Sequence, residues 1–326
     1  MHTNTETWRP AASLETLKLR ARLLERIRAF FSARGVLEVE TPILARATIP
    51  DPNLQSFETH YSGPGGPARL YLQTSPEFAM KRLLAAGSGS IFQVCKVFRD
   101  GEAGRLHNPE FTMIEWYRVG FDHHRLMDEV ALLVADVMQD RIPLAPAGRL
   151  GYREAFGRLA GIDPLTADEA VLRDCAQRFD ITPPPVLDRD GWLDLLMTHV
   201  VAARFPADRL TCVYDYPASQ AALARLSTAD PRVAERFEVY LGNVELANGF
   251  HELTHAAEQR TRFKADNNRR RLLGLPEMPL DEALLSALEA GLPDCAGVAL
   301  GFDRLVMLAA GVNAIDAVLA FPSDRA

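Results

Sequence analysis

Residues 91–117 constrain the fold of this chain most, because they contain two strand-like segments joined by a short polar loop. Ile91–Phe98 is rich in β-branched and aromatic residues and predicts an outgoing strand, and Phe111–Tyr117 predicts the strand that returns. The loop Asp100–Asn108 between them is polar and contains arginine, histidine and asparagine. Two strands joined by such a short loop favour an antiparallel sheet.

The return strand is predicted to place Phe111, Glu115 and Tyr117 on one face, since side chains alternate along a strand. An unpaired buried charge is costly, so Glu115 either meets an internal arginine or belongs to a binding site. Arg99 follows the outgoing strand at the mouth of the loop, where its planar guanidinium could hold a phosphate through two hydrogen bonds. The loop fits a solvated surface equally well.

Apolar residues recur at helical spacing in several other segments. The predicted helices span residues 13–34, 78–86, 122–139 and 258–273. Ser75 and Pro76 are residue types that begin a helix, and Gly35 is placed to end the first one. Residues 36–44 form an extended segment that contains a proline. Because strands come in runs and do not alternate strictly with helices, the sequence predicts an α+β fold.

A second group of strands is predicted in the last third of the chain. Residues 237–246 and 250–254 alternate like strands, and the Asn-Gly pair at 248–249 is a turn signal. Glu245 and Glu252 would then lie on adjacent strands. Two such carboxylates beside a phosphate suggest Mg²⁺, which favours a few carboxylates together with substrate oxygens. The alternative is surface charge on a hairpin.

Residues 297–308 predict a strand that turns directly into a helix. Gly297 and Gly301 leave room for a flat group to approach the backbone, and Arg304 places a second guanidinium at this corner. The segment is therefore either part of a binding site or a packing corner whose arginine forms a salt bridge.

The overall composition excludes several classes of protein. The 326 residues include 36 Lys+Arg and 43 Asp+Glu, a net charge of −7, and 48% are hydrophobic, as in ordinary globular proteins. No apolar run reaches the roughly 18–20 residues of a membrane helix. The net negative charge argues against nucleic-acid binding as the main function. The sequence has no P-loop and no dinucleotide fingerprint. The four cysteines form no C-x-x-C pair, which favours free thiols in a cytoplasmic protein.

The segment His251-Glu-Leu-Thr-His255 matches the H-E-x-x-H pattern of zinc proteases. That chemistry needs both histidines on one helical face. Here a strand-like segment and a turn signal precede the motif, so a helix would have to begin at the first ligand, and no third ligand is evident. A zinc protease is therefore not expected.

The chain resembles the catalytic domain of class II aminoacyl-tRNA synthetases, most closely the lysyl type. Three signature regions appear in order: GVLEVETPIL (35–44), FRDGEAGRLHNPEFTMIEWY (98–117) and GVALGFDRLVML (297–308). The segments SPE (75–77) and VELANGFHEL (244–253) match the lysyl pattern as well. The resemblance covers the chain from about residue 13 to the end, and five separated, ordered matches are far more specific than H-E-x-x-H. The resemblance implies an antiparallel sheet flanked by helices and a homodimer formed through the first signature.

The resemblance also implies roles for individual residues. Arg99 and Arg304 would be catalytic, with Arg99 on the α-phosphate of ATP and Arg304 enclosing the adenine together with Phe111. The further ATP contacts implied are Asp100, Gly101, Glu102, His107, Asn108, Glu245, Leu246 and Gly301. Glu245 and Glu252 would help to hold Mg²⁺. The residues implied to line the amino-acid site are Ser75, Pro76, Glu77, Glu115, Tyr117, Asn248, Phe250, Glu252 and Ala299.

Two positions depart from the family pattern. Gly101 stands where the second signature usually has the glutamate of Arg-x-Glu, and Glu102 follows one place later. Either the loop shifts so that Glu102 substitutes, or that adenine contact is lost. Ala299 stands where lysyl-type enzymes usually have glycine, which would reshape the amino-acid pocket.

The predicted organisation is a short tail, residues 1–12, and one catalytic domain, residues 13–326, with an inserted helical subregion at about 140–206. The tail leaves no room for the anticodon-binding barrel of lysyl-tRNA synthetases, and with the −7 charge this makes tRNA an unlikely acceptor. The chain therefore resembles the stand-alone members of the family. These proteins transfer (R)-β-lysine to a lysine side chain of elongation factor P.

The resemblance predicts ATP-dependent activation of (R)-β-lysine or lysine as an acyl-adenylate, with Mg²⁺ as cofactor and elongation factor P as protein partner. Two alternatives stay open. One is a truncated synthetase-like enzyme that charges tRNA or a small molecule, and the other is a non-catalytic binding module. The basic helix predicted at 258–273 could dock an acidic partner, although a solvated helix face explains it as well.

Overall fold

The computed structural model describes residues 8–326, which divide into two compact units. The first unit contains the described residues up to Val119, together with Thr254–Asp294 and Ala299–Ala326. The second contains Gly120–Leu253 and the short segment Cys295–Val298.

The strands of the first unit confirm the predicted strand–loop–strand. β5 (Ile91–Phe98) and β6 (Glu110–Val119) pair in an unbroken antiparallel register from Ile91 opposite Tyr117 to Phe98 opposite Glu110. β1 (Leu37–Glu38) joins the free edge of β5 in parallel. Within the extended segment predicted at 36–44, Leu37 and Glu38 form β1 and Leu44 begins β2 (Leu44–Ala45), and the residues around Pro42 lie outside both strands.

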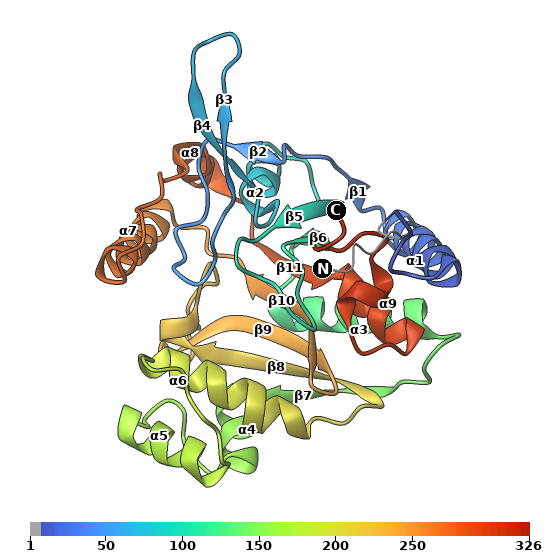
Figure 1. The fold of residues 1–326 in the computed structure, drawn as a ribbon. Helices are drawn as coiled ribbons and strands as arrows, with labels where there is room; N and C mark the ends of the chain where they lie inside the picture. Colours follow the sequence, from blue (N-terminus) through green and yellow to red (C-terminus); the bar gives the residue numbers. More distant parts are fainter. Residues whose placement is uncertain (1–7) are drawn as a thin grey trace, which may run out of the picture. The chain divides into compact units, whose positions relative to one another are not determined.

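A small separate sheet projects from this unit, as Figure 1 shows. β2 (Leu44–Ala45) and β3 (Glu58–Tyr61) both pair antiparallel with β4 (Ala68–Leu72). Its β3–β4 hairpin extends away from the other strands of the unit.

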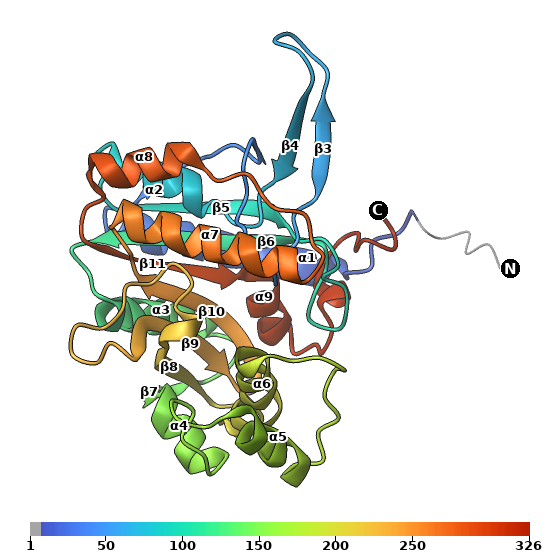
Figure 2. The same cartoon turned by 90° about the vertical axis from the view of Figure 1, so that its left-hand side faces the viewer.

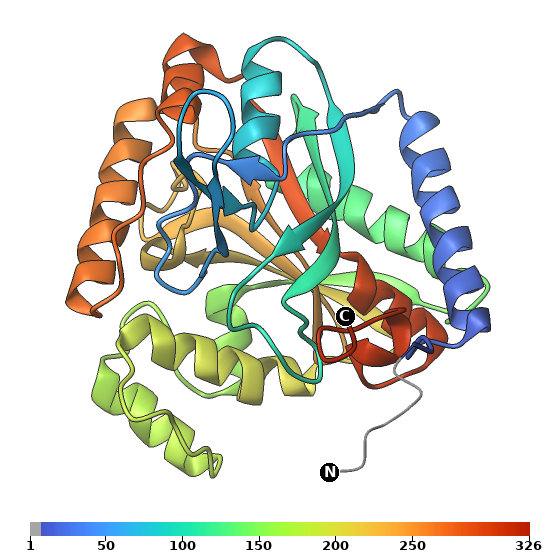
Figure 3. The same cartoon turned by 45° about the horizontal axis from the view of Figure 1, so that its top comes forward.

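The helices of the first unit form two groups. α1 (Leu14–Ser32) packs against α9 (Phe302–Ala310), which is followed by a 3₁₀ turn, η4 (Ile315–Val318) (Figure 3). α2 (Glu77–Ala85) packs against α8 (Glu282–Gly291), and α8 packs against α7 (Ala256–Leu272) (Figure 2). The backbone N–H of Thr16 donates to the Ser13 hydroxyl at 3.1 Å, which caps α1 at the residue where the sequence predicted its start.

The second unit contains four neighbouring sheet strands in the order β10-β9-β8-β7. Its strands are β7 (Ala145–Gly151), β8 (Arg209–Pro217), β9 (Val233–Leu241) and β10 (Val244–His251). β8, β9 and β10 are antiparallel to one another, and β7 pairs with β8 in parallel. α3 (His123–Met138) packs against β9 and β10.

Residues 140–206, where the sequence predicted an inserted helical subregion, contain β7 and a run of helices. The helices are α4 (Tyr152–Leu159), α5 (Glu169–Arg178), α6 (Arg189–Leu196), the π-helix η1 (Met197–Val201) and the 3₁₀ turn η2 (Ala202–Arg204). A second 3₁₀ turn, η3 (Ala218–Gln220), follows β8. Tyr152, Phe156 and Trp192 pack together in the apolar core that these helices share with β8 and β9.

β11 (Cys295–Gly301) begins in the second unit and ends in the first. It leads directly into α9, as the sequence predicted for residues 297–308. The mixture of largely antiparallel strands with surrounding helices confirms the predicted α+β class. Among the described helices, none combines the length and the hydropathy that crossing a bilayer would require.

Candidate functional site

The loop after β5 returns sharply towards Arg99. Gly101 has φ +80°, a left-handed conformation that glycine adopts without strain. The Glu102 carboxylate consequently comes back to 3.4 Å from Nη1 of Arg99. The shifted glutamate of the second signature therefore remains beside the arginine, and Gly101 is the residue that makes this turn possible.

Arg304 reaches the same loop from α9. Its Nη2 donates to Nε2 of His107 at 2.8 Å, and its Nε lies 3.3 Å from the carbonyl oxygen of Leu106. Burial lowers the pKa of His107, and the positive charges of Arg304 and Arg99 lower it further, against the opposing charge of Glu102. The unprotonated nitrogen of a neutral imidazole can accept a hydrogen bond from the arginine. Arg304 thus contacts the same loop that Arg99 begins.

The aromatic ring of Phe111, near the start of β6, lies beside the guanidinium of Arg99. The guanidinium carbon of Arg99 lies 5.1 Å from the centre of the Phe111 ring, a cation–π distance. Arg99 Nε is buried and has no hydrogen-bond partner among residues 8–326. Buried donors are normally paired, so this group is available for an anionic ligand.

Asn108 has a structural role in this loop. Its side-chain amide nitrogen donates to the carbonyl oxygen of Glu110 at 2.6 Å, and its oxygen accepts from the backbone N–H of Ser323 at 3.0 Å. The side chain is 5% exposed. Both ends of the Asn108 side chain therefore hold the loop in place.

Asp303 is a site residue that sequence reasoning missed. It is 1% exposed, accepts from the backbone N–H of Thr112 at 2.6 Å and forms an ion pair with Arg20 of α1. Arg20 in turn donates to the Thr112 hydroxyl at 2.7 Å. Asp303 thereby ties α9 to β6 and α1 at the residue before Arg304, so it fixes where that arginine points.

Glu115 is buried on β6 between two hydroxyl donors. Its carboxylate accepts from Ser75 Oγ at 2.7 Å and from Tyr117 Oη at 2.6 Å, so the predicted shared face of Glu115 and Tyr117 is confirmed. Burial, and then the charge of Glu115, raise the pKa of the neighbouring Cys95 thiol to about 12. The site therefore contains a buried acceptor for a cation.

Ser75, Pro76 and Glu77 line a pocket of about 450 Å³ between the segment around Thr48, α2 and the start of α8. The cap predicted for Ser75 differs in detail. The N-cap is Pro76, and Ser75 Oγ accepts from the backbone N–H of Glu77 at 3.0 Å. The Glu77 carboxylate accepts from Lys81 at 2.6 Å, so a substrate amine would have to share it with this lysine.

In the second unit, the predicted turn at 248–249 is wrong, because both residues lie inside β10. The hairpin turns instead at residues 242–243, between β9 and β10. Gly249 serves close packing: a Cβ there would lie 2.5 Å from the Phe237 ring and 2.8 Å from the carbonyl oxygen of Gly297. Position 249 requires glycine because a larger side chain would not fit there. The Asn-Gly pattern in the sequence cannot show whether glycine is present for close packing or for a turn.

Glu245 and Glu252 consequently do not lie on adjacent strands, because Glu245 is near the start of β10 and Glu252 follows its end. A register shift between Glu245 and Ala247 marks a bulge at Leu246. Cross-strand partners share a face, and the partners Tyr240, Glu238 and Arg236 lie at alternate positions. The bulge therefore puts Glu245 on the same face as Asn248 and Phe250.

Further polar groups lie on this face. Asn248 Oδ1 is buried without a hydrogen-bond partner among the described atoms, and Glu252 is 1% exposed. Glu238, which sequence reasoning did not single out, accepts from Tyr216 Oη at 2.7 Å and pairs with Arg236 at 2.5 Å. The alternation of side chains along β9 is the sequence signal that could have identified Glu238.

The remaining predicted residues are placed at the corner of β11 and α9. Ala299 lies within β11 and is partly exposed. Gly301 is the N-cap of α9 with φ −72°, a conformation that does not itself require glycine.

The basic helix predicted at 258–273 is α7, and most of its arginines have partners inside the first unit. Arg260 pairs with Glu282, Arg262 with Glu258 and Arg271 with Glu277. Arg270 is buried and donates to backbone oxygens of Pro276 and Asp51. These internal pairs reduce the charge available to an acidic partner, so the docking hypothesis loses its support.

The H-E-x-x-H motif does not form a zinc-protease helix. His251 is the last residue of β10, and His255 is the N-cap of α7, with its Nδ1 accepting from Glu258 at 3.3 Å.

Comparisons with known proteins agree with this architecture. The profile of the family described as "tRNA synthetases class II (D, K and N)" matches residues 4–325. Proteins from Salmonella dublin and Salmonella paratyphi B, each named elongation factor P–(R)-β-lysine ligase, are both 53% identical over 326 residues. Each alignment covers 99% of this chain and 99% of the relative. The chain therefore belongs to the class II tRNA synthetase family of the D, K and N types.

Proposed function

We propose that this chain is an AMP-forming ligase that uses ATP to activate (R)-β-lysine, or lysine, and transfers it to a lysine side chain of elongation factor P. One observation carries the ATP half of the proposal: Arg304 holds His107 of the loop between β5 and β6, and Arg99, which begins that loop, lies beside the ring of Phe111. The full-length identity to the Salmonella proteins supports the choice of amino acid and acceptor.

The first step joins a carboxylate oxygen of the amino acid to the α-phosphorus of ATP and breaks the bond to pyrophosphate. Negative charge develops on the phosphate oxygens in this step, and a prepositioned guanidinium stabilises it without reorganisation. The buried, unpaired Nε of Arg99 suits that role. No side-chain nucleophile is needed, because positioning supplies much of the acceleration.

The second step forms an amide bond. The neutral ε-amine of the acceptor lysine attacks the carbonyl carbon of the acyl-adenylate, the bond to AMP breaks, and the amine loses its proton. Glu115, held by Ser75 and Tyr117, is proposed to bind the ammonium group of the amino acid. Asn248, Phe250 and Glu252 keep the substrate-lining roles that the family implies, as does Ala299.

The second unit contains side-chain oxygen atoms of the kind that bind Mg²⁺. The Glu245 carboxylate, on the face that also holds the buried, unpaired Asn248 Oδ1, offers the oxygen ligands that Mg²⁺ prefers. Glu245 and Glu252 are the residues that would hold the ion, as the family implies. Bound Mg²⁺ would neutralise phosphate charge. Leu246, at the bulge, would offer its backbone to the nucleotide.

We further propose a cytoplasmic homodimer. Leu37, Ile43 and Leu44 of the first signature are 56%, 41% and 47% exposed, which suits a surface covered by a second copy. Free thiols at all four cysteines suit a reducing compartment.

ATP–pyrophosphate exchange with a panel of amino acids tests the activation step. We expect (R)-β-lysine, and more weakly lysine, to support exchange, and Arg99→Ala to lower the rate about 10²- to 10³-fold. Arg158→Ala is the matched control, since Arg158 is exposed and pairs with Glu154 in the same helix. Exchange by Arg99→Ala at the wild-type rate would remove Arg99 from the phosphate role.

The acceptor is tested separately, with the radiolabelled amino acid and either elongation factor P or tRNA. We expect label on the protein factor at a lysine side chain and none on tRNA. Label on tRNA alone would favour the truncated-synthetase alternative, and exchange without any transfer would exclude both acceptors.

A further inference from the structure

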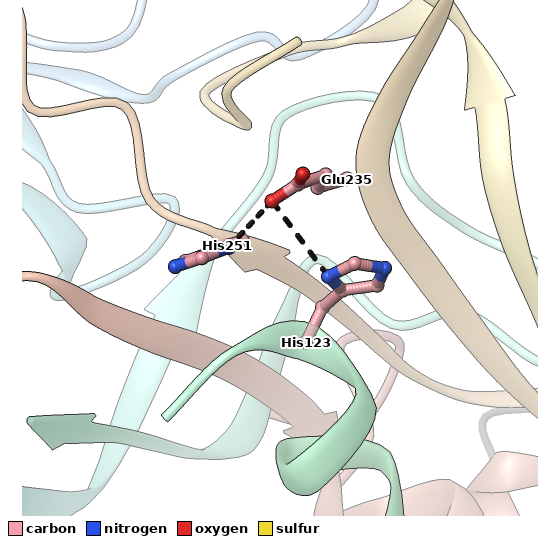
Figure 4. Close-up of side chains that lie close together, drawn as sticks. All are labelled: His123, Glu235 and His251. Atoms are coloured by element: carbon pink, nitrogen blue, oxygen red, sulfur yellow. Dashed lines mark hydrogen bonds and ion pairs between the residues drawn. The ribbon is translucent and has the colours of Figure 1, made fainter. Parts of the chain in front are cut away.

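We propose that His123, Glu235 and His251 form a binding site for one divalent transition-metal ion of the zinc class. One donor atom from each of the three side chains lies within 4.8 Å of the others, and all three residues belong to the second unit (Figure 4). This site differs from the H-E-x-x-H hypothesis, because it uses His251 without His255.

The backbone brings the three side chains together. Phe250 of β10 is opposite Arg236 of β9, so the next pair along the antiparallel register is His251 and Glu235. His251 Nδ1 lies 2.5 Å from Glu235 Oε2. His123 is the first residue of α3, which packs on these strands, and its Nδ1 lies 3.9 Å from the same oxygen. Figure 4 shows both histidines on either side of the carboxylate.

His123 is the independent sign of a missing ligand. It is 5% exposed, and neither of its ring nitrogens has a hydrogen-bond partner in the described part of the chain. Buried polar atoms are nearly always paired. Burial, and then the neighbouring His124 and His251, lower the pKa of His123 to about 3, so its ring is neutral at pH 7. A neutral imidazole offers a metal the lone pair that it needs.

The distances require only small adjustments. Zinc holds nitrogen and oxygen ligands at about 2.0–2.1 Å, so two tetrahedral ligands lie about 3.3 Å apart. The 3.9 Å contact must close and the 2.5 Å contact must open, which rotation of the Glu235 side chain allows, and the two histidine nitrogens, which lie within 4.8 Å of each other, must also approach. The proton shared by His251 and Glu235 leaves as the ion binds. Two imidazoles and one carboxylate, completed by water, favour zinc-like ions over Mg²⁺ or Ca²⁺.

Asp215 provides a supporting carboxylate on the far side of His123. Its Oδ1 lies 3.9 Å from His123 Nε2, the nitrogen that faces away from Glu235. Asp215 has φ +60° and sits where the β8–β9 register shifts, so a bulge directs it. Metal-binding histidines usually donate their second N–H to such a carboxylate. The nearby Arg149 is neutralised by its ion pair with Asp128.

On β10, the site lies on the opposite face from Asn248 and Phe250, two of the residues proposed for the amino acid. Consecutive strand residues point to opposite faces, so His251 and Gly249 face away from Asn248 and Phe250. An ion here would join the start of α3 to β9 and β10. We therefore assign it a structural role, independent of the ligase proposal.

Metal content and Co²⁺ spectra test the site without any measurement of activity. Untagged full-length protein is stripped with a chelator, dialysed, titrated with Zn²⁺ or Co²⁺, and analysed for bound metal. We expect one zinc per chain with a Kd below about 1 μM, a tetrahedral Co²⁺ absorption band and a higher Tm with zinc. Retention of no zinc and no Co²⁺ band by the wild-type protein would overturn the proposal.

Variants locate the ion. We expect His123→Asn and Glu235→Gln to weaken zinc binding at least 100-fold, and Asp215→Asn to weaken it about 10- to 100-fold. His255→Asn is the control, since it keeps the α7 cap and should bind as the wild type does. Loss of binding in His255→Asn with retention in His123→Asn would contradict the assignment. If a variant does not fold, as judged by circular dichroism, the wild-type spectrum and stoichiometry still decide.

Discussion

His107 and His123 show how two parts of one chain use the same side chain differently. His107 lies in the loop between β5 and β6 of the first unit and accepts a hydrogen bond from Arg304 at 2.8 Å. His123 is buried in the second unit, faces the carboxylates of Glu235 and Asp215, and has no hydrogen bond to either ring nitrogen within residues 8–326. Desolvation is the main cause that lowers the pKa of each imidazole.

The neighbours decide what each neutral ring can do. At His107 the lone pair is already used to hold a guanidinium, so the histidine positions Arg304. At His123 neither ring nitrogen is hydrogen-bonded within residues 8–326, and the carboxylates of Glu235 and Asp215 lie 3.9 Å away, which is the environment of a metal ligand. Histidine type and burial alone therefore do not assign a role, and the charge of the surrounding groups does.

Arg304→Ala should have the largest effect, because it removes the guanidinium and releases His107 together. We expect kcat/KM for ATP in pyrophosphate exchange to fall about 10²- to 10³-fold, with little change in Tm. Zinc binding in the second unit should not change, which separates the two histidine sites. An exchange rate within a few-fold of wild type would mean that the His107 loop does not hold the nucleotide.

Asp303→Ala should have the largest effect on stability. It leaves the Thr112 N–H and the Arg20 guanidinium without their buried acceptor, and breaking a buried ion pair typically costs about 3–5 kcal/mol. Urea unfolding measures the change. Asp316→Ala, at an exposed position in η4, should change stability by less than about 0.5 kcal/mol. A similar small loss in both variants would show that Asp303 does not clamp α9 to β6.

The sequence predicted well where one local pattern dictates the structure. The alternation from Ile91 to Tyr117 gave the antiparallel pair and the shared face of Glu115 and Tyr117, and the class II signatures gave the family. The pattern failed at 248–249, where Asn-Gly indicated a turn but a strand runs through because Phe237 packs against Gly249. Such a contact depends on another strand and has no local signal.

Long-range pairing explains the other omissions. Asp303 was not singled out because its partners, Thr112 and Arg20, lie far from it in the sequence. His123 and Glu235 were missed for the same reason, since only the packing of α3 on β9 brings them together. The basic run of α7 was visible in the sequence, but its pairing with Glu282 and Glu277 was not.

Gly249→Ala tests the packing of the second unit, which contains the His123 site. The added methyl group would meet the Phe237 ring at 2.5 Å, and overpacking of this kind costs about 1–3 kcal/mol. Because Phe237 lies two residues from Glu235 on β9, we also expect weaker zinc binding. Gly148→Ala is the control, since its Cβ would meet neighbours at an ordinary 3.7 Å. Equal unfolding free energies for the two variants would contradict the packing argument.

The pH dependence of stability should show the smallest effect, at His107. Its folded pKa lies below 6.5, so as the pH falls below 6.5 the unfolded chain binds more protons and stability is lost. The difference in unfolding free energy between wild type and His107→Gln should therefore shift against the wild type between pH 7.5 and pH 5.5, as measured by urea unfolding. The other histidines are common to both proteins and cancel, and His60→Gln controls for removing an exposed histidine. A difference that stays constant with pH would mean that Arg304 does not hold His107 in its neutral form.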